Sequence, residues 1–128
     1  MNNAHLKVRR SFVTAAIVSG INASVSVGFA VASVAKAQTT TSWYAADRAA
    51  VLLVILVVVA TRRSRTGLLA TGWGLVLVQA ADAVIGGAAG DVSKTVGPAI
   101  LAIATAAALL VDSRAGRDAS RDATSVIP

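Results

Sequence analysis

The 128-residue chain contains no cysteine, only one histidine and few aromatic residues, which make up 4% of it. Without cysteine, the chain can form no disulfide, thiolate metal site or cysteine nucleophile. His5 lies in a polar N-terminal segment, so haem ligation by histidine or a zinc site built from several imidazoles is excluded within one chain. No nucleophile and base pair, metal-ligand spacing or phosphate-binding loop is present. We therefore expect no catalytic residue, no metal site and no cofactor.

Polar surface is also scarce, because 55% of the residues are hydrophobic and the mean hydropathy is +0.71. A soluble domain needs a more polar exterior, so these values predict that the bilayer is the solvent of this chain. Four spans of about 20 residues each would use most of its length. The sequence predicts an all-α, integral membrane four-helix bundle forming a single domain.

The clearest element is a membrane hairpin. Two apolar segments, residues 49–60 and 68–79, flank the hexapeptide ThrArgArgSerArgThr at 61–66. Arginines do not lie in hydrocarbon, so the turn is expected at one water interface and both apolar segments must leave it in the same direction. This assigns the role of basic anchors at the cytoplasmic surface to Arg62, Arg63 and Arg65.

The net charge of +6 raises the question of nucleic acid binding. Position argues against it, because most basic residues stand beside apolar segments, namely Lys7, Arg9, Arg10, Arg62, Arg63, Arg65, Arg114, Arg117 and Arg121. Basic residues flank spans on the cytoplasmic side and meet anionic lipid headgroups there. We therefore expect membrane lipid as a partner, no nucleic acid, and both termini in the cytoplasm.

The expected boundaries follow from these patterns. They are a cytoplasmic tail at 1–10, a transmembrane domain at 11–111 with spans at about 11–34, 44–61, 67–86 and 95–111, and a polar cytoplasmic tail at 112–128. Pro98 is expected in the first turn of the fourth span. We favour disorder for the C-terminal tail because it alternates Arg and Asp with small residues.

The first apolar segment has a second interpretation. ArgArgSerPheVal at 9–13 is similar to a twin-arginine export signal, and AlaLysAla at 35–37 fits a signal-peptidase site. Cleavage after Ala37 would leave a three-span protein. We favour a retained helix because a signal peptide usually has only about 7 to 15 apolar residues.

Two stripes of residues run along the first span. Ser19, Asn22, Ser26 and Ser33 recur at helical spacing, and Gly20, Ser24 and Gly28 form a small-residue stripe on another face. Small residues let helix backbones approach closely, and hydroxyl or amide groups form bonds between helices. We favour packing surfaces over a ligand-lining role for both stripes.

The candidate site is a polar intramembrane cluster of Asp47, Arg48, Gln79 and Asp82 near the outer ends of the second and third spans. We expect Arg48 to bridge to Asp82 and Gln79, and Asp47 either to pair with Lys94 or to face external water. Ionisable groups in spans are costly and raise a hypothesis of function, such as holding a polar headgroup or carrying a proton on Asp82. We favour a structural pair that fixes the register of two helices, because burial costs less near the interface.

Residues 44–110 resemble a group of uncharacterised bacterial DoxX-like small membrane proteins with four helices. The resemblance is carried by AlaAspArgAla at 46–49, ThrArgArgSerArgThr at 61–66, AlaAspAlaValIleGly at 81–86 and GlyProAlaIleLeuAla at 97–102. The group usually has the order Arg-Asp and often a histidine before the fourth helix, whereas this chain has Asp47-Arg48 and Val96-Gly97. The resemblance implies a four-helix fold in a bacterial cytoplasmic membrane and no established reaction.

Together these patterns predict a non-enzymatic multi-pass protein of the bacterial inner membrane. Its polar interior either packs helices, against a second copy or another membrane protein, or holds a small amphiphile. The alternative is a membrane subunit of a redox or transport system, although the chain lacks Cys and has no histidine within a span.

Overall fold

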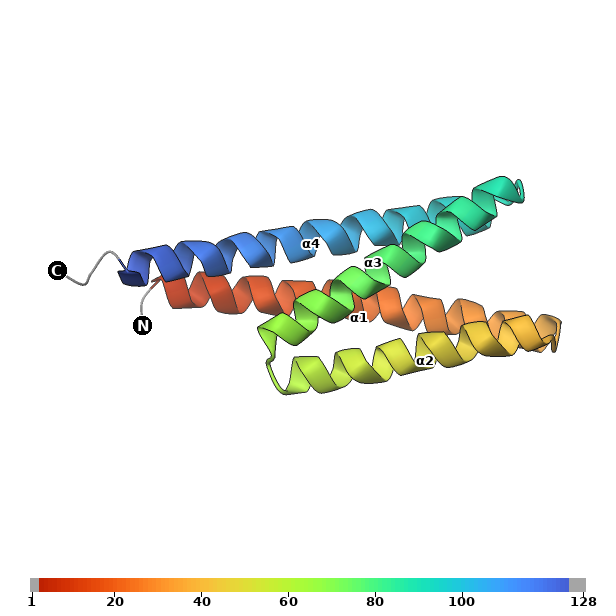
Figure 1. Ribbon diagram of the computed structural model, residues 1–128, viewed down its shortest axis with the longest axis horizontal. Helices are drawn as coiled ribbons and strands as arrows, with labels where there is room; N and C mark the ends of the chain where they lie inside the picture. The colour runs from red at the N-terminus through yellow and green to blue at the C-terminus, as the bar shows by residue number, and fades with distance from the viewer. Residues whose placement is uncertain (1–2, 125–128) are drawn as a thin grey trace.

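The computed structural model describes the backbone of residues 3–124 and the side chains of residues 6–121. This part of the chain forms four helices, α1 (Asn3–Lys36), α2 (Thr40–Thr61), α3 (Arg65–Ala88) and α4 (Val92–Thr124), and contains no strand (Figure 1). The all-helical, four-helix prediction is confirmed. Because side chains of residues 1–5 lie outside the described set, His5 is not placed.

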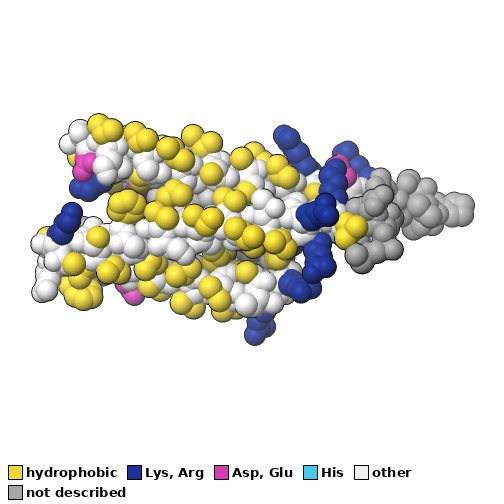
Figure 2. Space-filling view, turned by 180° about the vertical axis from the view of Figure 1, so that it is seen from behind, with side chains coloured by type: hydrophobic (Ala, Val, Ile, Leu, Met, Phe, Trp, Pro, Cys, Tyr) yellow, Lys and Arg dark blue, Asp and Glu magenta, His cyan; other side chains and the backbone are white. Residues whose placement is uncertain are grey.

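Successive helices run in opposite directions, so the connections gather at two ends (Figure 1). The start of α1, the end of α4 and the turn between α2 and α3 lie at one end, which we call the basic end. The turns that join α1 to α2 and α3 to α4 lie at the other, which we call the far end. Figure 2 shows Lys and Arg side chains gathered at the basic end, with hydrophobic side chains covering the middle of the molecule.

The helices pack as two arms. One arm is α1 with α2, the other is α3 with α4, and α1 also packs against α4, whereas α2 and α4 do not touch within the described residues. The arms approach each other at the basic end and separate toward the far end, where Figure 2 shows a notch between them. The bundle is therefore closed at one end and open at the other.

The exterior is apolar and the interior is made of small and medium side chains. Ile17, Leu77 and Ile103 are 56%, 69% and 70% exposed, whereas Ala15 and Leu109 are fully buried. Each helix also contains a segment long and apolar enough to cross a membrane. This distribution is typical of a multi-pass membrane protein, in which lipid covers the outward side chains.

Side-chain caps fix the starts of α2 and α3. The Thr39 hydroxyl accepts a hydrogen bond from the backbone N–H of Ser42, and the Ser42 hydroxyl accepts one from the N–H of Thr39. This capping box satisfies two N–H groups that the helix leaves free. Ser64 caps α3 in the same way by accepting from Gly67 N–H at 3.2 Å.

Helix α4 is longer at both ends than the expected fourth span at about 95–111. The tail at 112–128 was expected to be disordered, but α4 continues to Thr124, and residues 125–128 lie outside the described residues. The extension is held by packing, because Asp112 and Ala115 are buried against the bundle. At its other end α4 begins at Val92, so Pro98 lies in its second turn, where it removes an N–H that would donate to the Lys94 carbonyl.

Small residues allow α3 and α4 to approach closely. A Cβ at Gly72 would lie 2.7 Å from a Leu109 methyl carbon, and one at Gly86 would lie 2.5 Å from the backbone of Lys94. By contrast, a Cβ at Gly20 or Gly28 of α1 would meet nothing within 4 Å. The small-residue stripe of α1 therefore faces outward, and the helix contacts expected there do not form among the described residues.

Candidate functional site

A cleft of about 450 Å³ opens at the far end, and residues from all four helices line it. It lies where the two arms separate, and its volume falls in the range of about 300 to 1,000 Å³ that is usual for ligand pockets. Most of its wall is apolar, formed by Phe29, Ala30, Leu52, Leu75, Val78 and Leu101. An apolar ligand surface can therefore be covered there.

Polar residues form the smaller part of the lining of the cleft. Its lining carries two basic side chains, one carboxylate and one amide, contributed by Arg48, Lys94, Asp82 and Gln79, together with the hydroxyl groups of Ser26, Ser33, Thr41 and Ser93. Three of the four residues expected to form the polar cluster therefore do lie around one space. Asp47 is not among the residues that line it.

Arg48 and Asp82 form an ion pair that joins α2 to α3 across the widening gap. The Arg48 Nη2 donates to Asp82 Oδ1 at 3.4 Å, and the two side chains are 52% and 38% exposed. A long, half-exposed pair contributes only about 0 to 1 kcal/mol. The structure therefore brings these residues together as expected, and the pair alone stabilises the bundle little.

Gln79 faces the interior of the bundle, and no hydrogen bond joins it to Arg48 among the described side chains. Its Nε2 instead donates to Asn22 Oδ1 at 2.5 Å and to Ser26 Oγ at 2.8 Å. Asn22 Nδ2 then donates to Thr105 Oγ1 at 2.8 Å. This buried polar layer links α1, α3 and α4 and forms the polar floor of the cleft, because Ser26 and Gln79 also line it.

Asp47 is exposed and does not pair with Lys94. Lys94 Nζ instead lies 2.9 Å from Asp91 Oδ2, and Asp91 Oδ1 accepts from the Lys94 backbone N–H at the start of α4. The Lys94 ammonium beside Asp91, together with that N–H, holds the pKa of the Asp91 carboxyl below its ordinary value. Asp47 therefore lies outside the cleft, and it has no ion-pair partner among the described residues.

A second polar cluster, at the basic end, was not predicted. Arg65 Nε donates to Asp112 Oδ2 at 2.9 Å, and the Ser11 hydroxyl donates to Asp112 Oδ1 at 2.9 Å. Asp112 is completely buried and Arg65 is 29% exposed, with its guanidinium packed on Gly116. Arg65 is therefore part of a buried junction of α1, α3 and α4, which differs from the surface anchor role assigned to it from the sequence.

The sequence does contain a signal for this junction. Ala102, Thr105, Leu109 and Asp112 recur at spacings of three and four, so they share one face of a helix. All four are buried, and Ala115 continues the face. The polar composition after Val111 concealed it, because a tail rich in Arg and Asp is typical of solvated chain.

No protein-family model matches this chain, and no curated protein or solved structure was found to be similar to it. The resemblance to DoxX-like proteins therefore stays a prediction based on four short motifs.

Proposed function

We propose that the chain is a non-enzymatic integral membrane protein that holds a small amphiphile in the cleft at its far end. The observation that supports this proposal is the cleft itself, about 450 Å³ in volume, with apolar walls and a few charged groups. Such a space matches a molecule with one polar end and one hydrocarbon part.

The hydrogen-bond donors of the lining favour an anionic polar end. Each of its two basic side chains already faces one carboxylate, because Arg48 lies 3.4 Å from Asp82 and Lys94 lies 2.9 Å from Asp91. Arg48 makes a single long bond to Asp82, which leaves most of its donors free for a carboxylate, sulfate or phosphate group. The hydrocarbon part would then lie against Leu52, Leu75 and Val78.

The test compares two substitutions on neighbouring residues of α3. Val78 lines the cleft, whereas Leu77 is 69% exposed on the outer surface. The purified protein is photolabelled with a diazirine fatty acid and its labelled peptides are identified by mass spectrometry. We expect Val78→Phe to reduce labelling of cleft peptides several-fold because the larger ring fills the space, and Leu77→Phe to leave it unchanged.

Equal labelling of both variants would contradict the proposal, since the probe would then be bound to the outer surface. Arg48→Gln provides a second comparison. Its labelling by the fatty acid is expected to fall, whereas its labelling by an uncharged fatty alcohol is not. A thermal unfolding curve for each variant confirms that the fold is retained.

We also propose that the basic end faces the cytoplasm of a bacterium, in its inner membrane. The nine basic residues named above lie at that end, and only Lys36, Arg48 and Lys94 lie toward the other. Because the chain has no cysteine, single cysteines report topology directly. A membrane-impermeant maleimide is expected to label Gln38→Cys in intact cells and Thr66→Cys only after permeabilisation, and the reverse pattern would reject this orientation.

Retention of α1 is part of the same proposal. Asn22 and Ser11 of α1 supply partners to Gln79 and Asp112, so removal of residues 1–37 would leave both polar groups without them. The intact mass of the protein isolated from membranes tests this point. A mass lower by residues 1–37 would establish the three-span alternative.

A further inference from the structure

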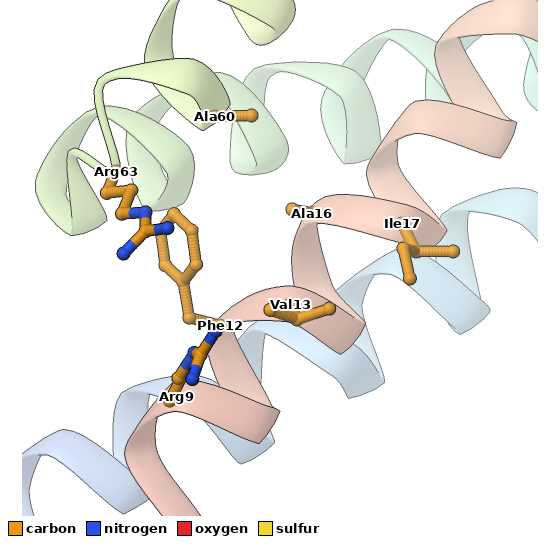
Figure 3. A pocket seen from close by; sticks show the side chains of 7 residues that line it. All are labelled: Arg9, Phe12, Val13, Ala16, Ile17, Ala60 and Arg63. Atoms are coloured by element: carbon orange, nitrogen blue, oxygen red, sulfur yellow. The ribbon is translucent and has the colours of Figure 1, made fainter. Parts of the chain in front are cut away.

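A second hollow, of about 350 Å³, lies at the basic end between the start of α1 and the turn after α2. Figure 3 shows Arg9 and Arg63 on either side of the Phe12 ring, with Val13 and Ile17 farther along α1. Ala60 of α2 closes the hollow opposite α1. One part of this groove is therefore cationic and the other apolar.

The two arginines of the groove carry charge that no nearby carboxylate balances. Neither Arg9 nor Arg63 forms an ion pair among the side chains of residues 6–121. The carboxylate of Asp112, which also lies at the basic end, is bonded to Arg65 and Ser11 instead. Two guanidinium groups that line one space repel each other unless an anion lies between them. Arg63 thus has no carboxylate partner among the described residues, whereas Arg65, from the same 61–66 segment, is paired with Asp112.

The backbone of the turn directs Arg63 toward this space. Arg63 has φ of 51°, the left-handed conformation that glycine usually occupies after a helix end, and it is the only described residue other than glycine with positive φ. In this conformation its side chain extends toward α1 beside the Phe12 ring (Figure 3). The turn therefore presents a cation where a glycine would fit the backbone better.

The length of α2 predicts that the groove lies at the depth where lipid headgroups meet hydrocarbon. The 22 residues of α2 span about 33 Å, close to the thickness of the hydrocarbon core, so Arg63 follows at its boundary. Arg9, Val13 and Ile17 are four residues apart on one face of α1, so Ile17 lies about 12 Å deeper than Arg9. Val13 and Ile17 are 46% and 56% exposed, which leaves an apolar surface for an acyl chain.

We propose that this groove is a binding site for one anionic phospholipid. Arg9 and Arg63 hold the headgroup phosphate by charge-assisted hydrogen bonds, and an acyl chain lies along Val13, Ile17 and Ala60. A free phosphate would use only the cationic part and leave the apolar part uncovered. This site is separate from the cleft at the far end, and the two proposals can fail independently.

The test uses the full-length protein in detergent and native mass spectrometry with added phosphatidylglycerol or phosphatidylcholine. Wild type is expected to bind one phosphatidylglycerol more tightly than any further lipid, and to prefer it to phosphatidylcholine. The double variant R9Q/R63Q should bind the first phosphatidylglycerol about tenfold more weakly or worse, because two charged hydrogen-bond donors are removed. The control R62Q/R114Q removes the same charge from exposed positions outside the groove and should retain full affinity.

Equal losses in the two double variants would overturn the proposal, because attraction to anionic lipid would then be a property of the whole basic end. Displacement of the lipid by soluble glycerol phosphate at the same concentration would also overturn it, since the apolar part would contribute nothing. The single variant Arg63→Gly separates binding from folding, because glycine suits the left-handed backbone. We expect it to keep the thermal stability of wild type and to bind the first lipid several-fold more weakly, and full binding by this variant would mean that Arg63 is not part of the site.

Discussion

At the basic end, Arg65 and Asp112 meet in a buried junction with Ser11, whereas at the far end Arg48 and Asp82 meet half exposed beside an open cleft. The first pair is short, at 2.9 Å, and the second is long, at 3.4 Å. Because the first pair is buried, removal of one partner should lower the free energy of unfolding strongly. Because the second pair is half exposed, removal of one partner should lower it only slightly. The comparison indicates that the ion pair between the arms contributes much more to stability at the basic end than at the far end.

The largest effect is expected from Asp112→Ala. This substitution leaves the guanidinium of Arg65 and the hydroxyl of Ser11 without their carboxylate partner, and breaking a buried pair costs about 3 kcal/mol or more. Unfolding by dodecyl sulfate in mixed micelles measures the change. The apolar double variant Arg65→Met with Asp112→Leu should recover much of the stability, and a mild effect of Asp112→Ala alone would remove the contrast between the two ends.

A smaller effect is expected from Gly86→Ala, which tests whether the arm of α3 and α4 stays rigid where the two arms separate. Its new Cβ would lie 2.5 Å from the Lys94 backbone, so the helices must move apart at a cost of about 1 to 3 kcal/mol. Gly74→Ala on the same helix is the matched control, because nothing lies within 4 Å of its Cβ. The same unfolding assay should show the control to be neutral or slightly stabilising. Equal free energies of unfolding for both variants would mean that α3 and α4 can move apart at Gly86 without loss of stability.

Asp82→Asn should change stability by only about 0 to 1 kcal/mol, because the pair that it breaks is half exposed. Removal of this carboxylate also raises the positive charge of the cleft, so binding of an anionic amphiphile should increase. Photolabelling and unfolding measured on the same sample distinguish the two roles. Loss of assembly with no change in labelling would support a purely structural pair.

The smallest effect concerns Asp91 at the start of α4. Its folded pKa lies below the ordinary value of 3.8, so its charged form stabilises the fold above that pH, and the contribution is lost as the pH falls through the folded pKa. Melting temperatures of wild type should therefore decline below about pH 4 slightly more than those of Asp91→Asn. Identical pH profiles would show that the Lys94 contacts add nothing to folding.

The sequence predicts the helices because their causes are local. Apolar runs of membrane length and the arginines of the 61–66 turn depend on the neighbouring residues alone. Gly72, Leu75, Gln79, Asp82 and Gly86 also recur at spacings of three and four in the sequence, and all of them except Asp82 are buried. Counting residues from the turn of the hairpin places Arg48 level with Gln79 and one helical turn below Asp82, within reach of an arginine side chain. Of these two expected contacts, the one with Asp82 forms.

The remaining contacts depend on how helices far apart in sequence are rotated toward each other. The partner of Gln79 is Asn22, on α1, and no pattern within α3 identifies it. Asp112 similarly meets Arg65 only because α4 continues past the end of the apolar run and presents the same face there. A buried carboxylate inside a polar segment has the same local sequence as an exposed one, so only the packed structure separates them.

The greater length of α4 also spreads the positive charge of the basic end along the axis of that helix. Asp112 lies level with Arg65, and α4 then carries Arg121 about 13 Å farther along its axis. That separation exceeds the Debye length of about 8 Å at physiological ionic strength. Lipid phosphates near Arg63 are therefore largely screened from Arg121, whereas Arg114 and Arg117 lie nearer to them along α4.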